Sequence, residues 1–248
     1  MEILNKRHFY NGQFIVFGHR GVPETHFENT IESFNEAIKL GYSGIELDVL
    51  TTKDNTLIVH HDRYLQKNQK NLIDKLSYQQ VHNMQPSIPK LEEVLSSVGH
   101  KTNINIEIKN QGIKSLIVVE QVICLLKEFN LIDNIIISSF SSQIIRESKK
   151  KDDRFMTAWI WGNQNLYFFS HWKSVLKYFR PNAIHINHQF ATNTIVEKIH
   201  SYDMKILAYT INEKKALKDL ITMGIDGVFT DSPKILQASK NVVGEAYE

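Results

Sequence analysis

The chain has 248 residues, of which 42% are hydrophobic and 23% are charged, a composition that is ordinary for a globular protein. With a formal net charge of +2 and no basic run longer than residues 149–151, the chain lacks the basic face of a nucleic-acid-binding protein. The single cysteine, Cys124, excludes an intrachain disulfide and a Cys-based zinc cluster, and the apolar helical run around it predicts a buried, inert thiol.

The first predicted elements are a strand and a helix. The continuous apolar run of residues 14–18 is typical of a buried parallel strand, and it ends at His19-Arg20-Gly21. A helix follows over residues 29–41, where Asn29 or Thr30 can serve as the N-cap and Gly41 suits the C′ position.

The next stretch, residues 44–62, carries much of the candidate chemistry. Side chains alternate along a strand, so Glu46 and Asp48 share one face while apolar residues occupy the other. Carboxylates in an apolar strand are costly to bury without a cation, and Mg²⁺ and Ca²⁺ are ions that carboxylates hold. A polar turn and a second extended run follow, and His61 lies just after that run. The alternative interpretation is an edge hairpin with a solvated acidic face.

Beyond this stretch, residues 65–90 are polar and irregular, with one or two helical turns near 77–82. Strands and helices then alternate regularly. The predicted strands are residues 104–108, 135–138, 156–160, 183–186, 205–210 and 227–229. The predicted helices are residues 91–98, 115–129, 141–150, 166–178, 194–202, 213–223 and one that begins at 233.

Eight strand–helix units without a linker favour a closed parallel barrel. We therefore predict a single (β/α)8 TIM-barrel domain over residues 1–248, with a short insertion after the second strand at about residues 63–88. A doubly wound open sheet is the alternative fold.

In such a barrel the functional groups lie at the carboxyl ends of the strands. The polar residues at these ends comprise three carboxylates, two histidines and two cations: Glu46, Asp48, Glu107, His19, His61, Arg20 and Lys109. Three carboxylates can hold one Mg²⁺ or Ca²⁺, and Arg and Lys can pair with phosphate oxygens. Two histidines that titrate near neutral pH can act as base and acid. The set suits phosphodiester chemistry.

The run FGHRGVPETHFENTIESFNEAIKLGYSGIELDVLTTKDNTLIVHHD contains His-Arg-Gly, Glu-Asn-Thr, Glu-x-Asp-Val and His-Asp in this order. These motifs resemble the signatures of the glycerophosphodiester phosphodiesterase family. Later motifs follow in the same order as IPKLEEVL at residues 88–95, IEIK at 106–109, SSF at 138–140 and GIDGVFTD at 224–231.

The resemblance implies a TIM barrel that uses one divalent cation to hydrolyse glycerophosphodiesters, such as glycerophosphocholine, to glycerol 3-phosphate and an alcohol. In this family the 2-hydroxyl of glycerol is thought to attack phosphorus, and water then opens the cyclic phosphate. Carried over by motif, the catalytic histidines fall on His19 and His61. The metal carboxylates fall on Glu46, Asp48 and Glu107, and the phosphate contacts on Arg20 and Lys109.

The chain departs from the family pattern at several positions. Phe27 stands where Pro is usual, which changes the stiffness of that loop. Tyr209 stands where Trp is common, and residues 65–69 replace a Leu-x-Arg-Thr-Thr motif, and these two departures bear on substrate choice. The segment between Asp62 and Ile88 is short for the inserted subregion. Because loops after barrel strands build the walls of the mouth, we expect an open mouth and deacylated substrates.

Several aromatic and histidine side chains have two interpretations. His60 should point away from His61 as a structural residue, whereas His185 and His188 could line the mouth. One of Trp159 and Trp161 should pack in the core, and the outer one, like Phe140, could form a wall of the substrate site.

Alternative functions on the same barrel are a phospholipase D-like enzyme, a phosphoinositide lyase and a non-catalytic phosphate-binding barrel. An amidohydrolase is excluded because strand one ends in His19-Arg20-Gly21 instead of His-x-His. We expect a small-molecule substrate and no nucleic-acid partner, and the oligomeric state stays open. Neither a signal-peptide core nor an apolar run of about 18 residues occurs, so we expect a cytoplasmic protein without membrane insertion.

Overall fold

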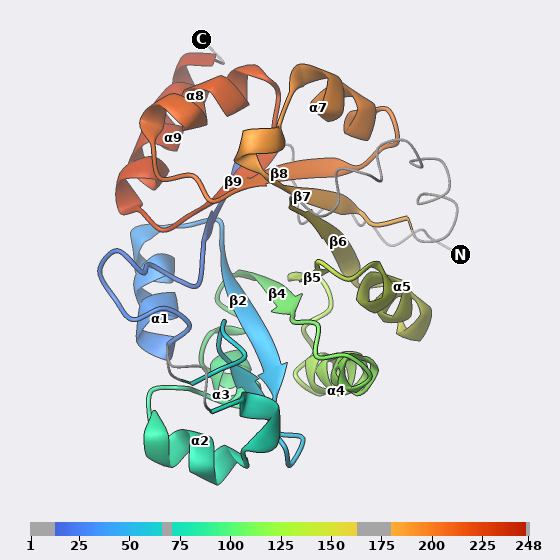
Figure 1. The fold of residues 1–248 in the computed structure, drawn as a ribbon. Helices are drawn as coiled ribbons and strands as arrows, with labels where there is room; N and C mark the ends of the chain where they lie inside the picture. The colour runs from blue at the N-terminus through green and yellow to red at the C-terminus, as the bar shows by residue number, and fades with distance from the viewer. Residues whose placement is uncertain (1–12, 66–70, 163–179, 247–248) are drawn as a thin grey trace.

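The computed structural model describes residues 13–65, 71–162 and 180–246, and in this part of the chain eight parallel strands close into a barrel (Figure 1). The barrel strands are β1 (Ile15–Gly18), β2 (Gly44–Thr51), β4 (Asn103–Ile108), β5 (Ile135–Ser139), β6 (Met156–Trp161), β7 (Ala183–Asn187), β8 (Lys205–Tyr209) and β9 (Gly227–Thr230). Strand β1 pairs with both β2 and β9, which closes the barrel. The predicted TIM-barrel fold is confirmed, and the open sheet is wrong.

Helices surround the strands. They are α1 (Ile31–Leu40), α2 (Tyr78–Met84), α3 (Leu91–Val98), α4 (Lys114–Glu128), α5 (Ser142–Lys151), α7 (Asn193–His200), α8 (Lys214–Thr222) and α9 (Pro233–Ala246). From β4 to β9 the described boundaries lie within two residues of the predicted ones. The predicted helix at residues 166–178 lies outside the described part of the chain.

Helix α1 shows why these boundaries follow from the sequence. The side chain of Thr30 accepts a hydrogen bond from the Ser33 backbone N–H, and this N-cap satisfies a donor at the helix start. The helix ends at Gly41, whose left-handed φ of 82° is a conformation that glycine adopts without steric cost. The predicted start and end of this helix are confirmed.

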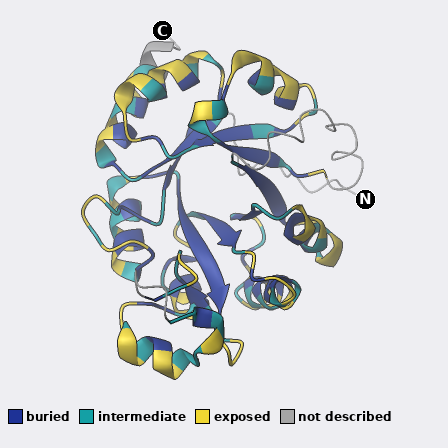
Figure 2. Cartoon of the chain, in the orientation of Figure 1, coloured by how far each residue is buried: buried dark blue, intermediate teal, exposed yellow. Residues whose placement is uncertain are grey.

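Apolar side chains form two layers, one between the strands and the helices and one inside the barrel. Outward-facing strand residues such as Ile45 and Leu47 pack in a large core with the helices, whose outer faces are exposed (Figure 2). Inward-facing side chains such as Phe17, Met156 and Phe229 form a separate apolar cluster inside the barrel. Strand alternation therefore turns Glu46, which is buried, toward the interior.

The insertion after the second strand has a core of its own. Strand β3 (Leu57–Val59) pairs antiparallel with β2, and a 3-10 turn η1 (Ile73–Lys75) and helix α2 follow. Their apolar side chains form a small cluster with the outer end of β2, made by Leu50, Ile58, Leu65, Ile73, Val81 and Ile88. That residues 1–248 form one domain stays a prediction.

Two predictions about packing are wrong. Cys124 is exposed, because the buried face of α4 carries Val119, Val122 and Leu126 and position 124 falls on the opposite side of the helix. Trp159 and Trp161 both pack in the outer core, so neither forms a wall of the substrate site. Among the helices that the structure describes, none is both long and apolar enough to cross a membrane.

Candidate active site

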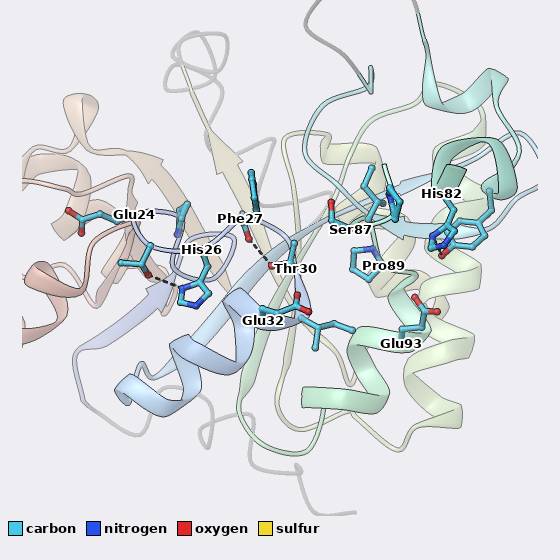
Figure 3. Close-up of a pocket in the computed structure, with 15 residues that line it drawn as sticks. Glu24, His26, Phe27, Thr30, Glu32, His82, Ser87, Pro89 and Glu93 are labelled. Atoms are coloured by element: carbon cyan, nitrogen blue, oxygen red, sulfur yellow. Dashed lines mark hydrogen bonds between the residues drawn. The ribbon is translucent and has the colours of Figure 1, made fainter. Parts of the chain in front are cut away.

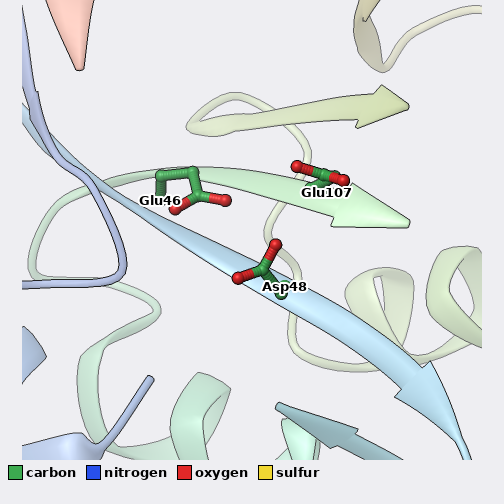
Figure 4. Close-up of side chains that lie close together, drawn as sticks. All are labelled: Glu46, Asp48 and Glu107. Carbon is green, nitrogen blue, oxygen red and sulfur yellow. The ribbon is translucent and has the colours of Figure 1, made fainter. Parts of the chain in front are cut away.

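Three buried carboxylates meet where β2 and β4 run side by side. Asp48 is paired in register with Glu107, and Glu46 lies two residues earlier on the same face of β2. One carboxylate oxygen from each residue lies within 4.8 Å of the others (Figure 4). Two oxygen ligands of one Mg²⁺ or Ca²⁺ are separated by at most about 5 Å. The predicted convergence of the three carboxylates is therefore confirmed, and their role as metal ligands stays a prediction.

The electrostatics of this cluster favour a cation. Burial and the nearby charge of Asp48 raise the pKa of Glu46 to about 8. Burial also raises the pKa of Glu107. The pKa of Asp48 is lowered despite its burial, because Lys109 and Arg20 outweigh that penalty. An oxygen-only donor set of buried, mutually repelling carboxylates fits a hard divalent ion such as Mg²⁺ or Ca²⁺.

The two predicted phosphate-binding cations lie beside these carboxylates. The Nζ atom of Lys109 lies 2.6 Å from Asp48 Oδ1 and 2.7 Å from Glu107 Oε1, and these charges raise the pKa of Lys109 despite its burial. The Nε atom of Arg20 lies 3.3 Å from Asp48 Oδ2. The Arg20 backbone N–H donates to Glu46 Oε2 at 2.8 Å. Both cations therefore lie directly beside the carboxylate cluster.

Each member of the Glu28-Asn29-Thr30 motif has a separate structural role. Glu28 pairs with the Arg20 guanidinium at 3.0 Å, and Thr30 caps α1. The Asn29 side chain donates to Asp48 Oδ2 at 2.8 Å and accepts from the Asp48 backbone N–H at 3.2 Å. Of the two predicted caps, Thr30 is the one that the structure uses. Asn29 instead orients a carboxylate, a role that the sequence analysis missed.

Both candidate histidines have an aspartate on the same ring nitrogen. His19 Nδ1 lies 2.8 Å from Asp231 Oδ1, and the other oxygen of Asp231 accepts a 2.7 Å hydrogen bond from Asn212. His61 Nδ1 lies 2.8 Å from Asp62 Oδ1. Each contact occupies Nδ1 and leaves Nε2 as the nitrogen that can reach a substrate. Neither Asp231 nor Asn212 was predicted as a site residue, although the Thr-Asp end of the GIDGVFTD motif was a signal for Asp231.

The two histidines differ in the direction of their pKa shifts. Burial lowers the pKa of His19, but the hydrogen bond to Asp231 and the charge of Glu46 outweigh it, so the net pKa is raised. Burial and the charge of Lys109 lower the pKa of His61. Near neutral pH the first imidazole is therefore the better proton donor and the second the better acceptor.

A cavity of about 170 Å³ joins these groups. It is lined by six of the seven candidate side chains, namely His19, His61, Arg20, Lys109, Glu46 and Glu107. Its remaining wall comes from Asn105, Phe140, Ile160, His185, Tyr209, Thr210 and Phe229. The predicted wall residue Phe140 and the predicted histidine His185 thus line the cavity. His60 and His188 do not line it.

A wider groove of about 910 Å³ lies between the loop after β1 and the insertion (Figure 3). Its lining includes Phe27, His82 and Glu93, and none of the seven candidate site residues. By volume alone the groove would be the preferred candidate for a binding site. The smaller cavity, however, is lined by the convergent charged groups, so we take the smaller cavity as the functional site. Phe27, the departure from the family's proline, is 86% exposed and lies away from that cavity.

Comparison with known proteins gives one consistent family. The model of the glycerophosphoryl diester phosphodiesterase family matches residues 19–235. A glycerophosphodiester phosphodiesterase of Bacillus altitudinis is 31% identical over 238 residues, which cover 88% of this chain and 94% of that protein. One from Caldanaerobacter subterraneus is 30% identical over 239 residues, with coverages of 90% and 96%.

Solved structures agree on the fold. The glycerophosphodiester phosphodiesterase of Thermotoga maritima superimposes with a TM-score of 0.78 at 27% identity, covering 90% of this chain and 97% of that one. An Oleispira antarctica phosphodiesterase, solved in complex with the product sn-glycerol-3-phosphate, gives a TM-score of 0.82 at 24% identity, with coverages of 94% and 99%.

Proposed function

Because the chain belongs to the glycerophosphoryl diester phosphodiesterase family and is thus a phosphodiester hydrolase, we propose that it converts glycerophosphodiesters to glycerol 3-phosphate and an alcohol. Glycerophosphocholine and glycerophosphoethanolamine are the proposed substrates. The main support for the proposal is the convergence of three buried carboxylates, of which one oxygen each lies within 4.8 Å of the others. These carboxylates lie beside a cavity that both histidines line. The Oleispira complex with sn-glycerol-3-phosphate supports the choice of product.

In this proposal Glu46, Asp48 and Glu107 hold one Mg²⁺ or Ca²⁺. The bound ion supplies Lewis-acid polarisation of a phosphoryl oxygen and offsets the negative charge of the transition state. Arg20 and Lys109 bind the remaining phosphate oxygens, Arg20 through its planar fork and Lys109 as a point charge.

The chain's own histidines move the protons. His61, the better acceptor, takes the proton from the glycerol 2-hydroxyl as that oxygen forms its bond to phosphorus. His19, whose pKa the hydrogen bond to Asp231 raises, donates a proton to the departing alcohol oxygen as its bond to phosphorus breaks. For the cyclic phosphate the roles reverse: His19 deprotonates the attacking water, and His61 returns its proton to the 2-oxygen, which yields glycerol 3-phosphate.

A product assay tests the proposal. The purified protein should release glycerol 3-phosphate from glycerophosphocholine and from glycerophosphoethanolamine when Mg²⁺ or Ca²⁺ is added, and a chelator should stop the release. The Glu46→Gln variant, which keeps a side chain of similar shape, is the matched control and should be inactive. Accumulation of the cyclic phosphate would instead favour the lyase alternative, and absence of any product with either ion would contradict the proposal.

A further inference from the structure

Two buried polar atoms in the wall of the catalytic cavity have no hydrogen-bond partner among the residues that the structure describes. They are Nε2 of His185 and Oδ1 of Asn105. Both side chains are 1% exposed, and both line the 170 Å³ cavity. A buried polar atom without a partner destabilises the folded state, and such atoms are few in native proteins. A ligand that supplies the missing partners would remove this penalty.

The fold holds both side chains in place. On β7 the neighbours Ile184 and Ile186 pack in the outer core, so alternation turns His185 inward, where its ring centroid lies 4.8 Å from that of Phe229. On β4 the amide nitrogen of Asn105 donates to Ser138 Oγ at 3.0 Å. With the amide nitrogen engaged in this bond, Oδ1 of Asn105 is left as a free acceptor.

The two groups are suited to a neutral hydroxyl group. Burial lowers the pKa of His185 to about 3, so the imidazole is uncharged and offers a donor or an acceptor instead of a charge. Asn105 Oδ1 is an acceptor only. An alcohol O–H can donate to one of these groups and accept from the other, whereas the phosphate oxygens are already matched by Arg20 and Lys109.

The volume of the cavity limits the size of this ligand. An engineered apolar cavity of about 150 Å³ accommodates benzene, which has six non-hydrogen atoms. The present cavity of about 170 Å³ is similar in volume, and it is partly polar. Glycerol also has six non-hydrogen atoms, so a three-carbon polyol unit is small enough to enter this cavity.

We propose that His185 and Asn105 form a polyol subsite that binds the terminal hydroxyl of the glycerol unit and so selects glycerol diesters over other phosphodiesters. The inference rests on the proposed function for the position of the phosphate at Arg20 and Lys109. The terminal hydroxyl is the glycerol oxygen farthest from that phosphate, and the 2-hydroxyl is engaged as the nucleophile. His185 and Asn105 therefore set specificity and transfer no proton.

The test compares two substrates that differ in this hydroxyl alone. Glycerophosphocholine has it, whereas 2-hydroxypropyl phosphocholine lacks it and keeps the nucleophilic 2-hydroxyl, the phosphate and the choline. Wild-type kcat/KM should favour glycerophosphocholine by at least about tenfold, because a site built to bind a hydroxyl rejects an analogue without it. The His185→Leu variant should lose this preference, its kcat/KM falling for glycerophosphocholine and changing less than about threefold for the analogue.

Matched variants separate specificity from structural damage. His185→Gln keeps a hydrogen-bonding group and should retain part of the preference. His188→Leu, on the turn that follows the same strand but outside the cavity lining, should retain all of it. Because His185→Leu removes a buried unpartnered atom, its Tm should equal or exceed that of the wild type. Partial misfolding lowers the rates with the two substrates in the same proportion, so it does not change the ratio of these rates.

The inference is overturned if the wild type hydrolyses both diesters equally, or if His185→Leu keeps the wild-type ratio. Calorimetric binding of glycerol 3-phosphate and of 2-hydroxypropyl phosphate gives a readout without turnover. If the wild type hydrolyses neither diester, the proposed function fails, and the calorimetry still decides the subsite. Tighter binding of glycerol 3-phosphate that is lost in His185→Leu supports the subsite, and equal binding of the two phosphates overturns it.

Discussion

At the scale of single residues, burial and neighbouring charges bias the protonation of the ionisable groups in the site. Asp48 stays ionised between Lys109 and Arg20, whereas burial and the charge of Asp48 raise the pKa of Glu46. The two histidines are biased in opposite directions, His19 by Asp231 and His61 by burial. Pairs of titratable groups whose environments separate their pKa values are typical of acid–base assignments.

Removing either histidine should slow the chemical step without weakening substrate binding. We expect His19→Ala and His61→Ala each to lower kcat by at least about 10²-fold, the usual effect of a positioned acid or base. KM should change much less, because the proposed metal ion and Arg20 would still bind the phosphate. Steady-state release of glycerol 3-phosphate from glycerophosphocholine measures both constants. Near wild-type turnover in either variant would disprove that histidine's role.

Asp231 should act through His19 as a positioning residue. Asp231→Asn keeps an acceptor oxygen for the imidazole but removes the charge that raises the pKa of His19. The pKa of His19 should therefore fall, and the alkaline limb of the kcat/KM profile, where His19 loses its proton, should move to lower pH.

The control for this shift is Asp62→Asn. Asp62 is the partner of His61, but its side chain is 73% exposed, so solvent screens its charge. We expect its effect on the profile to be smaller than that of Asp231→Asn. An alkaline limb that stays in place or moves to higher pH in Asp231→Asn would show that Asp231 has no such influence.

At the scale of elements, the insertion uses its apolar side chains for its own folding. Leu65 and Ile73 are buried in a cluster with Ile58 and Val81, and Leu76 packs against them. These residues therefore do not form a groove for an acyl chain. The described part of the insertion also lacks the sustained amphipathic helix of a membrane-surface protein, since α2 spans only Tyr78–Met84.

Because the apolar side chains of the insertion are buried in its own core, we predict a preference for deacylated substrates. We expect kcat/KM for glycerophosphocholine to exceed that for lysophosphatidylcholine, with weak discrimination among choline, ethanolamine and glycerol leaving groups. Parallel assays of both compounds below the micellar concentration of the lysolipid give the comparison. A preference of about tenfold for the lysolipid, equivalent to about 1.4 kcal/mol, would refute the open-mouth interpretation.

At the scale of the whole molecule, closure of the barrel assembles the site. His19 and Asp231 are 212 residues apart in the chain, and they meet because β1 pairs with β9. The parallel pairing of β2 with β4 brings their carboxylates together, and the pairing of β1 with β2 joins them to the strand that ends at His19. A divalent ion at this position would therefore bind the folded chain and not the unfolded one.

The proposed ion should stabilise the whole barrel. At a Ca²⁺ or Mg²⁺ concentration of about 100 times its Kd, the folded state should gain about 2.7 kcal/mol, which corresponds to a rise in Tm of about 5–10 °C for a chain of this size. Thermal unfolding with the ion, with a chelator and with a matched concentration of Na⁺ tests this. Glu46→Gln should show a much smaller rise. Equal Tm values for the wild type with the ion and with the chelator would contradict the metal site.

The sequence alone was sufficient for the order of the elements and for the seven candidate site residues. Hydrophobic alternation along a strand and helical periodicity are local patterns, so they predicted eight strand–helix units and a shared face for Glu46 and Asp48, opposite the apolar side chains of their strand. The carboxyl ends of parallel strands meet at one end of a barrel, which is why polar residues at those ends could be grouped without knowing their distances.

Only the tertiary structure decided which side chains are partners and which face is buried. Asp231 holds His19, and Asn29 orients Asp48, because hydrogen bonds between distant segments depend on barrel closure and loop path. Cys124 is exposed because the rotation of α4 against the barrel is set by the packing of its whole buried face. His185 lines the cavity and His188 does not, because the cavity lies inside the barrel beside β7 and His188 falls on the turn that follows this strand.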